Sequence, residues 1–465
     1  MTIQDMIPSD AASLKRVSTE HPQHNSAESL SDSFNDASRS RSASTLVDEA
    51  ALPDEKTADL DYPEGGPVAW SVVFGSWCAM FAIFGIWNSV GLFQAYLVEH
   101  DLAQYDESTI SWIFSTYSFA FFFCGVQVGP VFDKYGARPL VICGSLGTVV
   151  GVMMFSLCHQ YYQFFLSFAV LCGISGSMIF TPSVAVVGQY FLARRGLATG
   201  VAATGGSFGG IMFPLMLRSL IPQIGFAWAV RVVGFFVLFF LTFSVICLKS
   251  RIVGGSGDSS TIDLSAFKDK KFAFMAIGNF LIEWALLIPS TYFITYAIWK
   301  GVDEHLAYAL TAVMNAASVF GRWLPGYVSD KYGMFNMLIL TVFSCGVLSL
   351  GIWLPIAATE GRNFGGAIAY LILFGFTSGS GISLAPVCFS KICDIKDYGK
   401  RYGTAYSLAS IGSLTGVPIA GQILNRMNGD YTGLVIFCGA SYMVSTVFLV
   451  LARGYSVGWK IKTNF

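Results

Sequence analysis

The feature of this sequence that most restricts its fold is a series of long apolar stretches that begins after residue 61. A helix that crosses a lipid bilayer needs about 20 consecutive, mostly apolar residues. Twelve stretches reach this length, near residues 68–96, 109–130, 139–158, 163–189, 197–217, 228–248, 272–298, 306–328, 334–355, 365–389, 403–424 and 433–452. The sequence therefore predicts an all-α membrane protein with twelve transmembrane helices.

The composition agrees with a chain that is surrounded partly by lipid. Of its 465 residues, 54% are hydrophobic and only 12% are charged, whereas an ordinary soluble protein is about 25% charged. The net charge of -1 gives no indication of nucleic-acid binding. The ten cysteines are scattered, without a CxxC pair or a His–Cys cluster. We therefore expect neither a metal site nor a cofactor.

Hydrophilic segments divide the chain. Residues 1–61 are rich in Ser, Asp and Arg and lack periodic apolar positions, which predicts a disordered cytoplasmic tail. The longest later break, at 249–271, separates six apolar stretches from the other six. We expect six-helix halves at 62–248 and 272–455, a cytoplasmic linker at 249–271 and a cytoplasmic C-terminal tail at 456–465.

The distribution of Lys and Arg predicts the orientation. Most of these residues lie in the loops on one side of the predicted membrane, the side that also holds both termini. Short cytoplasmic loops carry an excess of positive charge. Both termini should therefore be cytoplasmic. We expect a monomer in the plasma membrane, with a vacuolar or other organelle membrane as the alternative.

Two charged hexapeptides nearly repeat each other, VFDKYG at 131–136 and VSDKYG at 328–333. Each follows the second apolar stretch of a half. Each also has a glycine four residues ahead of its aspartate, Gly129 in the first copy and Gly326 in the second. The repeat suggests that the same turn occurs once in each half.

Two further matches occur in the same order along the chain. The segment RRGLATG resembles KRYGTAY, which pairs Arg195 with Arg401, and Pro182 corresponds to Pro386. Three ordered matches predict two parallel six-helix repeats, an arrangement found in a large class of transporters. We expect Arg195 to anchor its helix at the positively charged inner surface.

The segment G-x-x-x-D-K-Y-G-A-R, from Gly129 to Arg138, resembles the loop motif of the major facilitator superfamily. PEGGPVAW at 63–70 and YFLARRGLATGVAATGGSFGG at 190–210 resemble the two signatures of the monocarboxylate porter family, in its fungal branch. The resemblance covers 62–455. It implies the major facilitator fold and secondary active transport of a small organic anion, with a monocarboxylate as the best candidate, by alternating access.

The same resemblance implies that the loop motif is a gate. Gly136 suits a tight turn between two helices, and Gly129, Asp133 and Arg138 would be gate residues. We assign Asp330 of the second copy a weaker gating role, because MFN replaces the ARP that follows the first DKYG. The alternative is a tight loop that serves only as a connection.

Two ionisable residues lie well inside apolar stretches, Glu283 in the seventh and Arg322 in the eighth. Ionisable groups at this depth are costly and therefore mark candidate functional sites. Both positions are 17 residues from the loop that joins the two stretches, or about 25 Å of helix. The two charges could therefore meet at one level. The alternative is that Glu283 faces another helix and is protonated.

The resemblance to monocarboxylate porters assigns the binding of the substrate anion to Arg322, whose guanidinium suits a carboxylate. Animal members of that family have an aspartate one turn earlier, where this chain has Ser318, and a lysine in the first helix, where it has Asn88. A simple proton–lactate cycle is therefore in doubt. Asn88 and Ser318 remain candidate substrate contacts, and Glu283 becomes the candidate for proton coupling.

Tyr292 is a further candidate substrate contact. In a straight helix it lies on the face opposite Glu283, at 100° per residue. The two side chains can line one cavity only if Pro289 kinks the helix. The alternative is an ordinary packing aromatic near the outer membrane interface.

Two other functions stay open. One is export of a fungal secondary metabolite, and the other is a nutrient sensor that has a transporter fold but transports little. No Ser-His-Asp, HExxH or Cys-His set occurs, so we do not expect an enzyme. The expected partners are a small organic anion or metabolite, the lipid bilayer and protons, and not nucleic acid.

Overall fold

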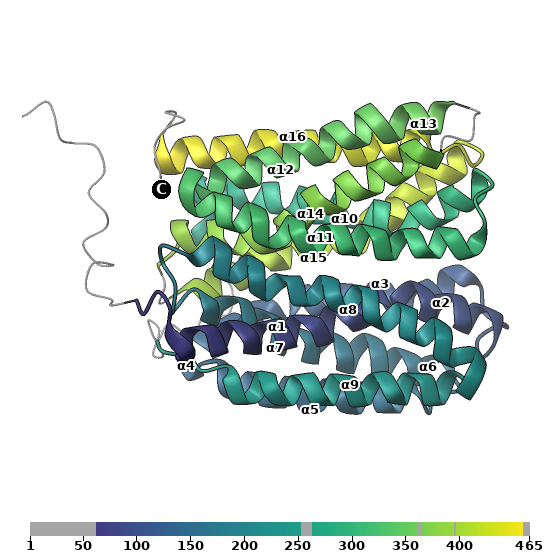
Figure 1. Ribbon diagram of the computed structural model, residues 1–465, viewed down its shortest axis with the longest axis horizontal. Coiled ribbons are helices and arrows are strands. Elements are labelled where there is room, and N and C mark those ends of the chain that lie inside the picture. The colour runs from purple at the N-terminus through teal and green to yellow at the C-terminus, as the bar shows by residue number, and fades with distance from the viewer. Residues whose placement is uncertain (1–61, 253–262, 360–363, 395–396, 459–465) are drawn as a thin grey trace, which may run out of the picture. The chain divides into compact units, whose positions relative to one another are not determined.

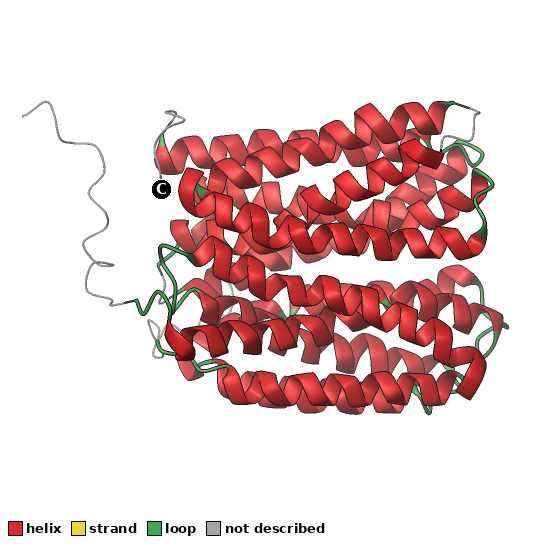
Figure 2. Cartoon of the chain, in the orientation of Figure 1, coloured by secondary structure: helices red, strands yellow, loops and turns green. Residues whose placement is uncertain are grey.

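The computed structural model describes residues 62–252, 263–359, 364–394 and 397–458, and within these ranges it consists of helices joined by short turns (Figure 2). The predicted tail at 1–61 and most of the C-terminal tail lie outside the described residues. The expected linker is described only at its two ends, where η2 (Leu264–Lys268) is a short 3-10 helix.

The first six predicted stretches are all helical. Several are built from consecutive helices that meet at a local break, such as the one at Ser89 in the first stretch. The helices are α1 (Gly66–Asn88), α2 (Val90–Glu99), α3 (Glu107–Phe123), α4 (Gly125–Tyr135), α5 (Ala137–Phe155), α6 (Tyr161–Phe164), η1 (Phe165–Cys172), α7 (Gly173–Val187), α8 (Arg195–Ile224) and α9 (Phe226–Cys247).

The last six stretches are helical as well. The ninth is made of three consecutive helices, of which η3 is π-helical. The helices are α10 (Lys270–Trp299), α11 (Glu304–Tyr332), α12 (Met334–Leu348), η3 (Ser349–Trp353), α13 (Leu354–Ala358), α14 (Phe364–Ile392), α15 (Tyr398–Arg426) and α16 (Thr432–Val457).

Eleven helical segments in the described ranges are long and apolar enough to cross a membrane. The remaining predicted helix, α11, has 29 residues and is present in the fold, but it is not one of these eleven. It carries Asn315, Ser318 and Arg322, which lower its hydropathy. The long helix that does not meet these criteria therefore holds Arg322 and two further polar residues of the candidate site.

The helices before and after the 249–271 break form two groups, seen in Figure 1 as α1–α9 and α10–α16. Within each group the first and fifth predicted stretches pack together, α1 with α8 and α10 with α15. Between the groups, α8 packs on α11 and α14, and α15 packs on α3 and α4. These two seams enclose the space between the groups.

The two DKYG segments end helices in the same way. Gly136 follows α4 with a φ of 78°, and Gly333 follows α11 with a φ of 94°. Positive φ strongly favours glycine because other residues carry a Cβ atom. The tight turn expected after each copy is therefore present. We call the end of the bundle that holds these two turns the motif end.

Candidate functional site

A cavity lies between the two groups of helices. The first group contributes aromatic rings and one amide, and the second contributes the charged and most of the polar groups. The lining residues are Phe84, Trp87, Asn88, Phe122, Phe180, Glu283, Leu286, Leu287, Ser290, Met314, Asn315, Ser318, Arg322, Gly375, Ser378, Gly379, Ile382 and Tyr406. Both ionisable residues singled out from the sequence therefore line the same cavity.

Arg322 is buried, with 4% of its surface exposed. Its Nη1 donates to the Ala203 carbonyl on α8 at 2.6 Å, and its Nε donates to the Ser318 hydroxyl at 3.3 Å. It forms no ion pair with any residue that the structure describes. A guanidinium has five N–H groups, so most of them are left for an anion in the cavity.

Neighbouring residues shape the space around the guanidinium. A Cβ atom at Gly206 would lie 2.6 Å from Nη1 of Arg322, so a side chain at this position of α8 would displace the guanidinium. Ser207 donates to Ser318 across the α8–α11 seam at 3.2 Å. The hydroxyl of Ser318 thus links Arg322 to the other group of helices.

Glu283 lies on α10 with 5% of its surface exposed. Within the described ranges its carboxyl has neither a hydrogen bond nor an ion pair. It lines the same cavity as Arg322, but the two side chains do not form an ion pair here. A buried carboxyl without a charged partner can be neutral, so the structure leaves a protonatable group inside the cavity.

Asn88 joins the two groups of helices at the cavity. Its Nδ2 donates to the Phe84 carbonyl at 2.8 Å, and its Oδ1 accepts from Asn315 on α11 at 3.4 Å. Asn315 is a site residue that we did not predict. It lies seven positions before Arg322, and this spacing on one face of the same helix was the available signal.

The structure does not bring Tyr292 to the cavity. Its hydroxyl donates to the Val417 carbonyl on α15 at 3.1 Å, and its ring packs close to Gly421. Pro289 does lie within α10, but Tyr292 is not part of the cavity lining. The contact that we expected between Tyr292 and the substrate is therefore absent from this arrangement.

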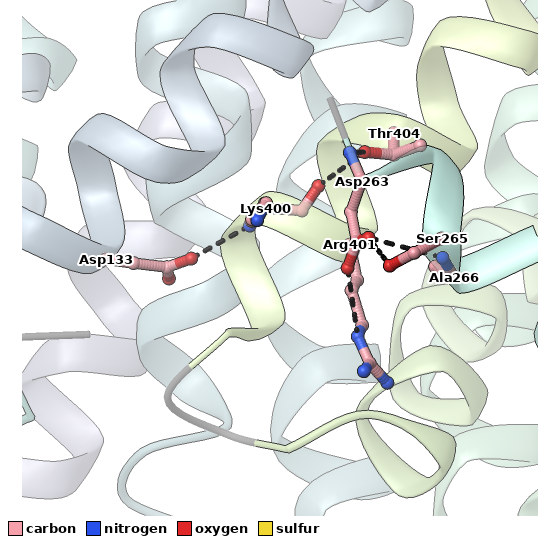
Figure 3. A network of polar contacts seen from close by, with 7 residues as sticks. All are labelled: Asp133, Asp263, Ser265, Ala266, Lys400, Arg401 and Thr404. Atoms are coloured by element: carbon pink, nitrogen blue, oxygen red, sulfur yellow. Dashed lines mark hydrogen bonds and ion pairs between the residues drawn. The ribbon is translucent and has the colours of Figure 1, made fainter. Parts of the chain in front are cut away.

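At the motif end, Asp133 binds the first turn of α15. Its Oδ1 accepts from the Gly399 amide at 3.0 Å and its Oδ2 from the Lys400 amide at 2.8 Å (Figure 3 draws the contact with Lys400). A helix N-terminus has unpaired N–H groups and a partial positive charge, and both favour a carboxylate. Asp133 therefore links the first group of helices to the second.

Asp330 makes the reciprocal contact. Its Oδ1 accepts from the Gly196 amide at 2.8 Å and its Oδ2 from the Leu197 amide at 2.9 Å, at the start of α8. The geometry matches that of Asp133. The weaker role that we expected from the altered flanking sequence finds no counterpart in these contacts, because the flanking residues do not take part in them.

Glycines let the backbones meet at these points. A Cβ atom at Gly129 would lie 2.0 Å from the Gly399 carbonyl oxygen, and one at Gly326 would lie 2.4 Å from that of Gly196. Side-chain atoms essentially never approach so closely, so any larger residue requires the helices to separate. By contrast, Arg138 is exposed and no contact of its side chain is seen among the described residues.

The structural repeat has a different register from the one that we read in the sequence. Asp133 and Asp330 occupy equivalent positions, so the residues that they contact, Gly399 and Gly196, are equivalent as well. The sequence match had instead aligned Arg195 with Arg401. The difference is three positions, less than one helical turn, which leaves nearly the same helix face in contact. Small residues recur on that face, and either alignment therefore looks plausible from the sequence alone.

Arg195 is also not the surface anchor that we expected. Only 3% of its surface is exposed, and its guanidinium donates to the Phe191 and Gly188 carbonyls and to the Ser390 hydroxyl on α14. It therefore lies in the interface between the two groups of helices. Burial of the helix start under α14 accounts for the difference.

The starts of α8 and α15 are each supported by a second carboxylate, which comes from the same group of helices as the supported helix. Glu64, from the PEGG segment, accepts from the Leu192 and Ala193 amides at 2.6 and 2.7 Å and from the Arg194 amide at 3.3 Å. The two sequence signatures are therefore in direct contact. Because these amides precede α8, Glu64 fixes the loop from which that helix begins.

Asp263 has the corresponding place ahead of α10 (Figure 3). Its carboxylate lies 3.6 Å from Nε of Arg401, and its backbone amide donates to Thr404 at 3.2 Å. Burial disfavours its charge, but hydrogen bonds from Ser265 and the Ala266 amide and the positive charges of Lys400 and Arg401 together hold the pKa of Asp263 below its usual value.

Comparison with known proteins decides the family. The family described as Major Facilitator Superfamily matches residues 72–368. The chain belongs to this superfamily. It is a multi-pass integral membrane protein, and members of the superfamily carry small molecules across membranes.

Relatives in this superfamily span nearly the whole chain. The MFS transporter asaE of Aspergillus flavus is 39% identical over 87% of this chain and 90% of the relative. The riboflavin transporter MCH5 of Saccharomyces cerevisiae is 36% identical over 86% and 80%, and the fujikurins efflux protein of Gibberella fujikuroi is 35% identical over 92% and 91%. The crystal structure of the human organic anion transporter MFSD10 has the same fold, with a TM-score of 0.63 at 15% identity over 83% of this chain and 100% of that one.

Proposed function

We propose that the protein is a secondary active transporter of an organic anion, which binds to Arg322 in the cavity and crosses by alternating access. The observation that carries the proposal is a buried guanidinium without an ion pair among the described residues, in a cavity that both groups of helices line. A desolvated arginine attracts a carboxylate strongly and can bind it through two parallel hydrogen bonds. Asn88 and Ser318 would complete the polar part of the site.

Alternating access requires that contacts at one end of the bundle form and break. At the motif end, Asp133 and Asp330 each join one group of helices to a helix start of the other. We assign the gate to these two carboxylates with Gly129 and Gly136, and we expect Arg138 to act in another step of the cycle. The motif end should face the cytoplasm.

Glu283 is the proposed proton-coupling residue. A carboxyl that is ionised beside the free guanidinium and takes up a proton when an anion neutralises Arg322 would couple the two ligands through their electrostatic interaction. Glu283→Gln keeps the shape and removes the titration. We expect this variant to exchange the anion without net proton movement, measured with a pH-sensitive dye inside proteoliposomes. Proton movement equal to that of the unchanged protein would exclude Glu283.

Export of a fungal secondary metabolite is the second candidate. The aromatic and aliphatic part of the cavity lining favours it, because a three-carbon acid has little apolar surface to place there. The relatives include both a riboflavin transporter and an efflux protein for fujikurins, so uptake and export are both open for this chain. A non-transporting nutrient sensor would bind the same ligand without net flux.

Transport in proteoliposomes tests the main proposal. Arg322→Ala should reduce anion transport at least tenfold, because a desolvated charge–charge hydrogen bond contributes about 1.5–3 kcal/mol. Arg322→Lys should recover only a part of the rate, since an ammonium lacks the planar fork. Arg426→Ala, at an exposed position, is the matched control. Anion transport that survives Arg322→Ala would refute the assignment of the site.

A further inference from the structure

Aromatic rings dominate one part of the cavity lining. Phe84, Trp87, Phe122, Phe180 and Tyr406 form a continuous set that we call the aromatic wall. The ring centroids of Trp87 and Phe122 lie 5.5 Å apart, as do those of Phe122 and Tyr406, and those of Phe84 and Phe180 lie 5.7 Å apart. These are the distances of packed aromatic pairs. The rings therefore hold one another in place.

The aromatic wall adjoins the proposed anion site. The guanidinium carbon of Arg322 lies 5.8 Å from the ring centroid of Phe84. An anionic group bound to Arg322 therefore has a ring beside it, and the body of the same molecule can extend along the other rings. The remaining apolar lining is aliphatic, from residues such as Leu286 and Ile382.

The lining of the cavity argues against a small acid as its main ligand. Beside Arg322, much of the lining consists of aromatic rings and aliphatic side chains. A three-carbon acid held at Arg322 would leave the five rings in contact with water, which is unfavourable. Apolar walls with a small number of polar groups that fix orientation are typical of sites for drug-sized ligands.

We propose that the transported anion carries a planar aromatic ring system, which packs on the aromatic wall while its anionic group binds Arg322. This inference rests on the proposed function of Arg322 and narrows its substrate to a class. It replaces the small monocarboxylate of the sequence analysis with a larger aromatic acid. Packing against ring faces favours a flat ring over a saturated one of the same size.

Two probes of equal charge and carbon skeleton test the proposal, 2-naphthoate and decahydro-2-naphthoate. Binding to the purified full-length protein in lipid nanodiscs is measured by titration calorimetry. We expect 2-naphthoate to bind about tenfold more tightly than its saturated analogue, as stacked ring contacts contribute beyond buried area. Equal affinities for the two probes would overturn the inference.

Variants of the aromatic wall test which residues cause the preference for 2-naphthoate over its saturated analogue. Phe122→Leu should weaken 2-naphthoate binding several-fold and leave the saturated probe nearly unchanged. Tyr406→Leu should do the same, while Tyr406→Phe, which keeps the ring, should retain the preference. Phe235→Leu on α9, where the ring is 56% exposed and lies outside the cavity lining, is the control for general effects. If the preference for 2-naphthoate persists in both leucine variants, the aromatic wall is not its cause and the inference is refuted.

The same titrations separate this inference from the proposed function. Arg322→Ala should weaken both probes equally, since both carry the same carboxylate. If both probes bind equally well and both depend on Arg322, the anion site stands and the aromatic class fails. If neither probe depends on Arg322, the proposed function fails, and the inference fails with it.

Discussion

The starts of α8 and α15 are two versions of one construction. Each start is held by a carboxylate from the other group of helices, Asp330 for α8 and Asp133 for α15. Each is also held by a carboxylate from the segment that precedes the first helix of its own group, Glu64 for α8 and Asp263 for α15. Four carboxylates thus support two helix starts.

The contacts between groups match, and those within a group differ. Asp133 and Asp330 use the same atoms, two oxygens on two consecutive backbone amides. Glu64 accepts three amides of the loop before α8, whereas Asp263 pairs with the Arg401 side chain and donates its amide to Thr404. Under the proposed alternating access, both contacts between groups break in one step, and their matched geometry suits that role.

The largest expected effect comes from adding a methyl group where the backbones meet. Gly129→Ala and Gly326→Ala should each oppose closure of the motif end by about 1–3 kcal/mol, the usual cost of overpacking. We expect transport to fall roughly tenfold or more in both variants. Gly91→Ala is the control, since nothing lies within 4 Å of a Cβ atom there.

Initial transport rates in proteoliposomes check this prediction, with the accessibility of the motif end measured by thiol labelling at an introduced cysteine. Increased labelling in both variants would show that closure has been lost. A Gly129→Ala protein that matches Gly91→Ala in rate and labelling would contradict the close approach of α4 and α15.

The second-largest expected effect tests whether the two carboxylates contribute equally to closure of the motif end. Asp133→Asn and Asp330→Asn remove the charge from a helix N-terminus and should each weaken closure by about 1–2 kcal/mol. The two variants should lose transport to a similar extent, measured as initial rates at equal protein content. An Asp330→Asn protein that transports normally, beside an impaired Asp133→Asn protein, would restore the weaker role read from the sequence.

A smaller effect should distinguish Glu64, which supports a helix start within one group, from Asp133 and Asp330, which join the two groups. Glu64→Gln weakens charged hydrogen bonds at a partly exposed site and should cost up to about 1 kcal/mol of stability. We expect a lower melting temperature in detergent with unchanged labelling of the motif end. Increased labelling at an unchanged melting temperature would instead make Glu64 part of the gate.

The smallest effect is the pH dependence at Asp263. Its pKa in the folded protein is lower than in the unfolded chain, so the ionised form stabilises the fold. This contribution is present above the unfolded value of about 3.9 and is lost as the pH falls through the folded pKa. Asp263→Asn should flatten the decrease of the melting temperature below pH 4. Identical profiles for the two proteins would remove Asp263 as a support of α15.

The sequence by itself determined the helices and the family resemblance. Each apolar stretch became helical because a helix satisfies its backbone hydrogen bonds within one segment and the bilayer sets its length. The turns after the two DKYG segments were also predictable, because Gly136 and Gly333 adopt a positive φ that few other residues tolerate. The equal depth of Glu283 and Arg322 was also readable from the sequence, whereas the cavity that both line came from the structure.

Only the tertiary structure decided which side chains meet. The contact of Asp330 with α8, the burial of Arg195, the register of the repeat and the aromatic wall all join residues that are far apart in the sequence. They depend on the rotation of each helix about its axis. A membrane helix that is apolar on every face carries no periodic signal of that rotation. Packing between the helices therefore supplied the information that the sequence pattern lacks.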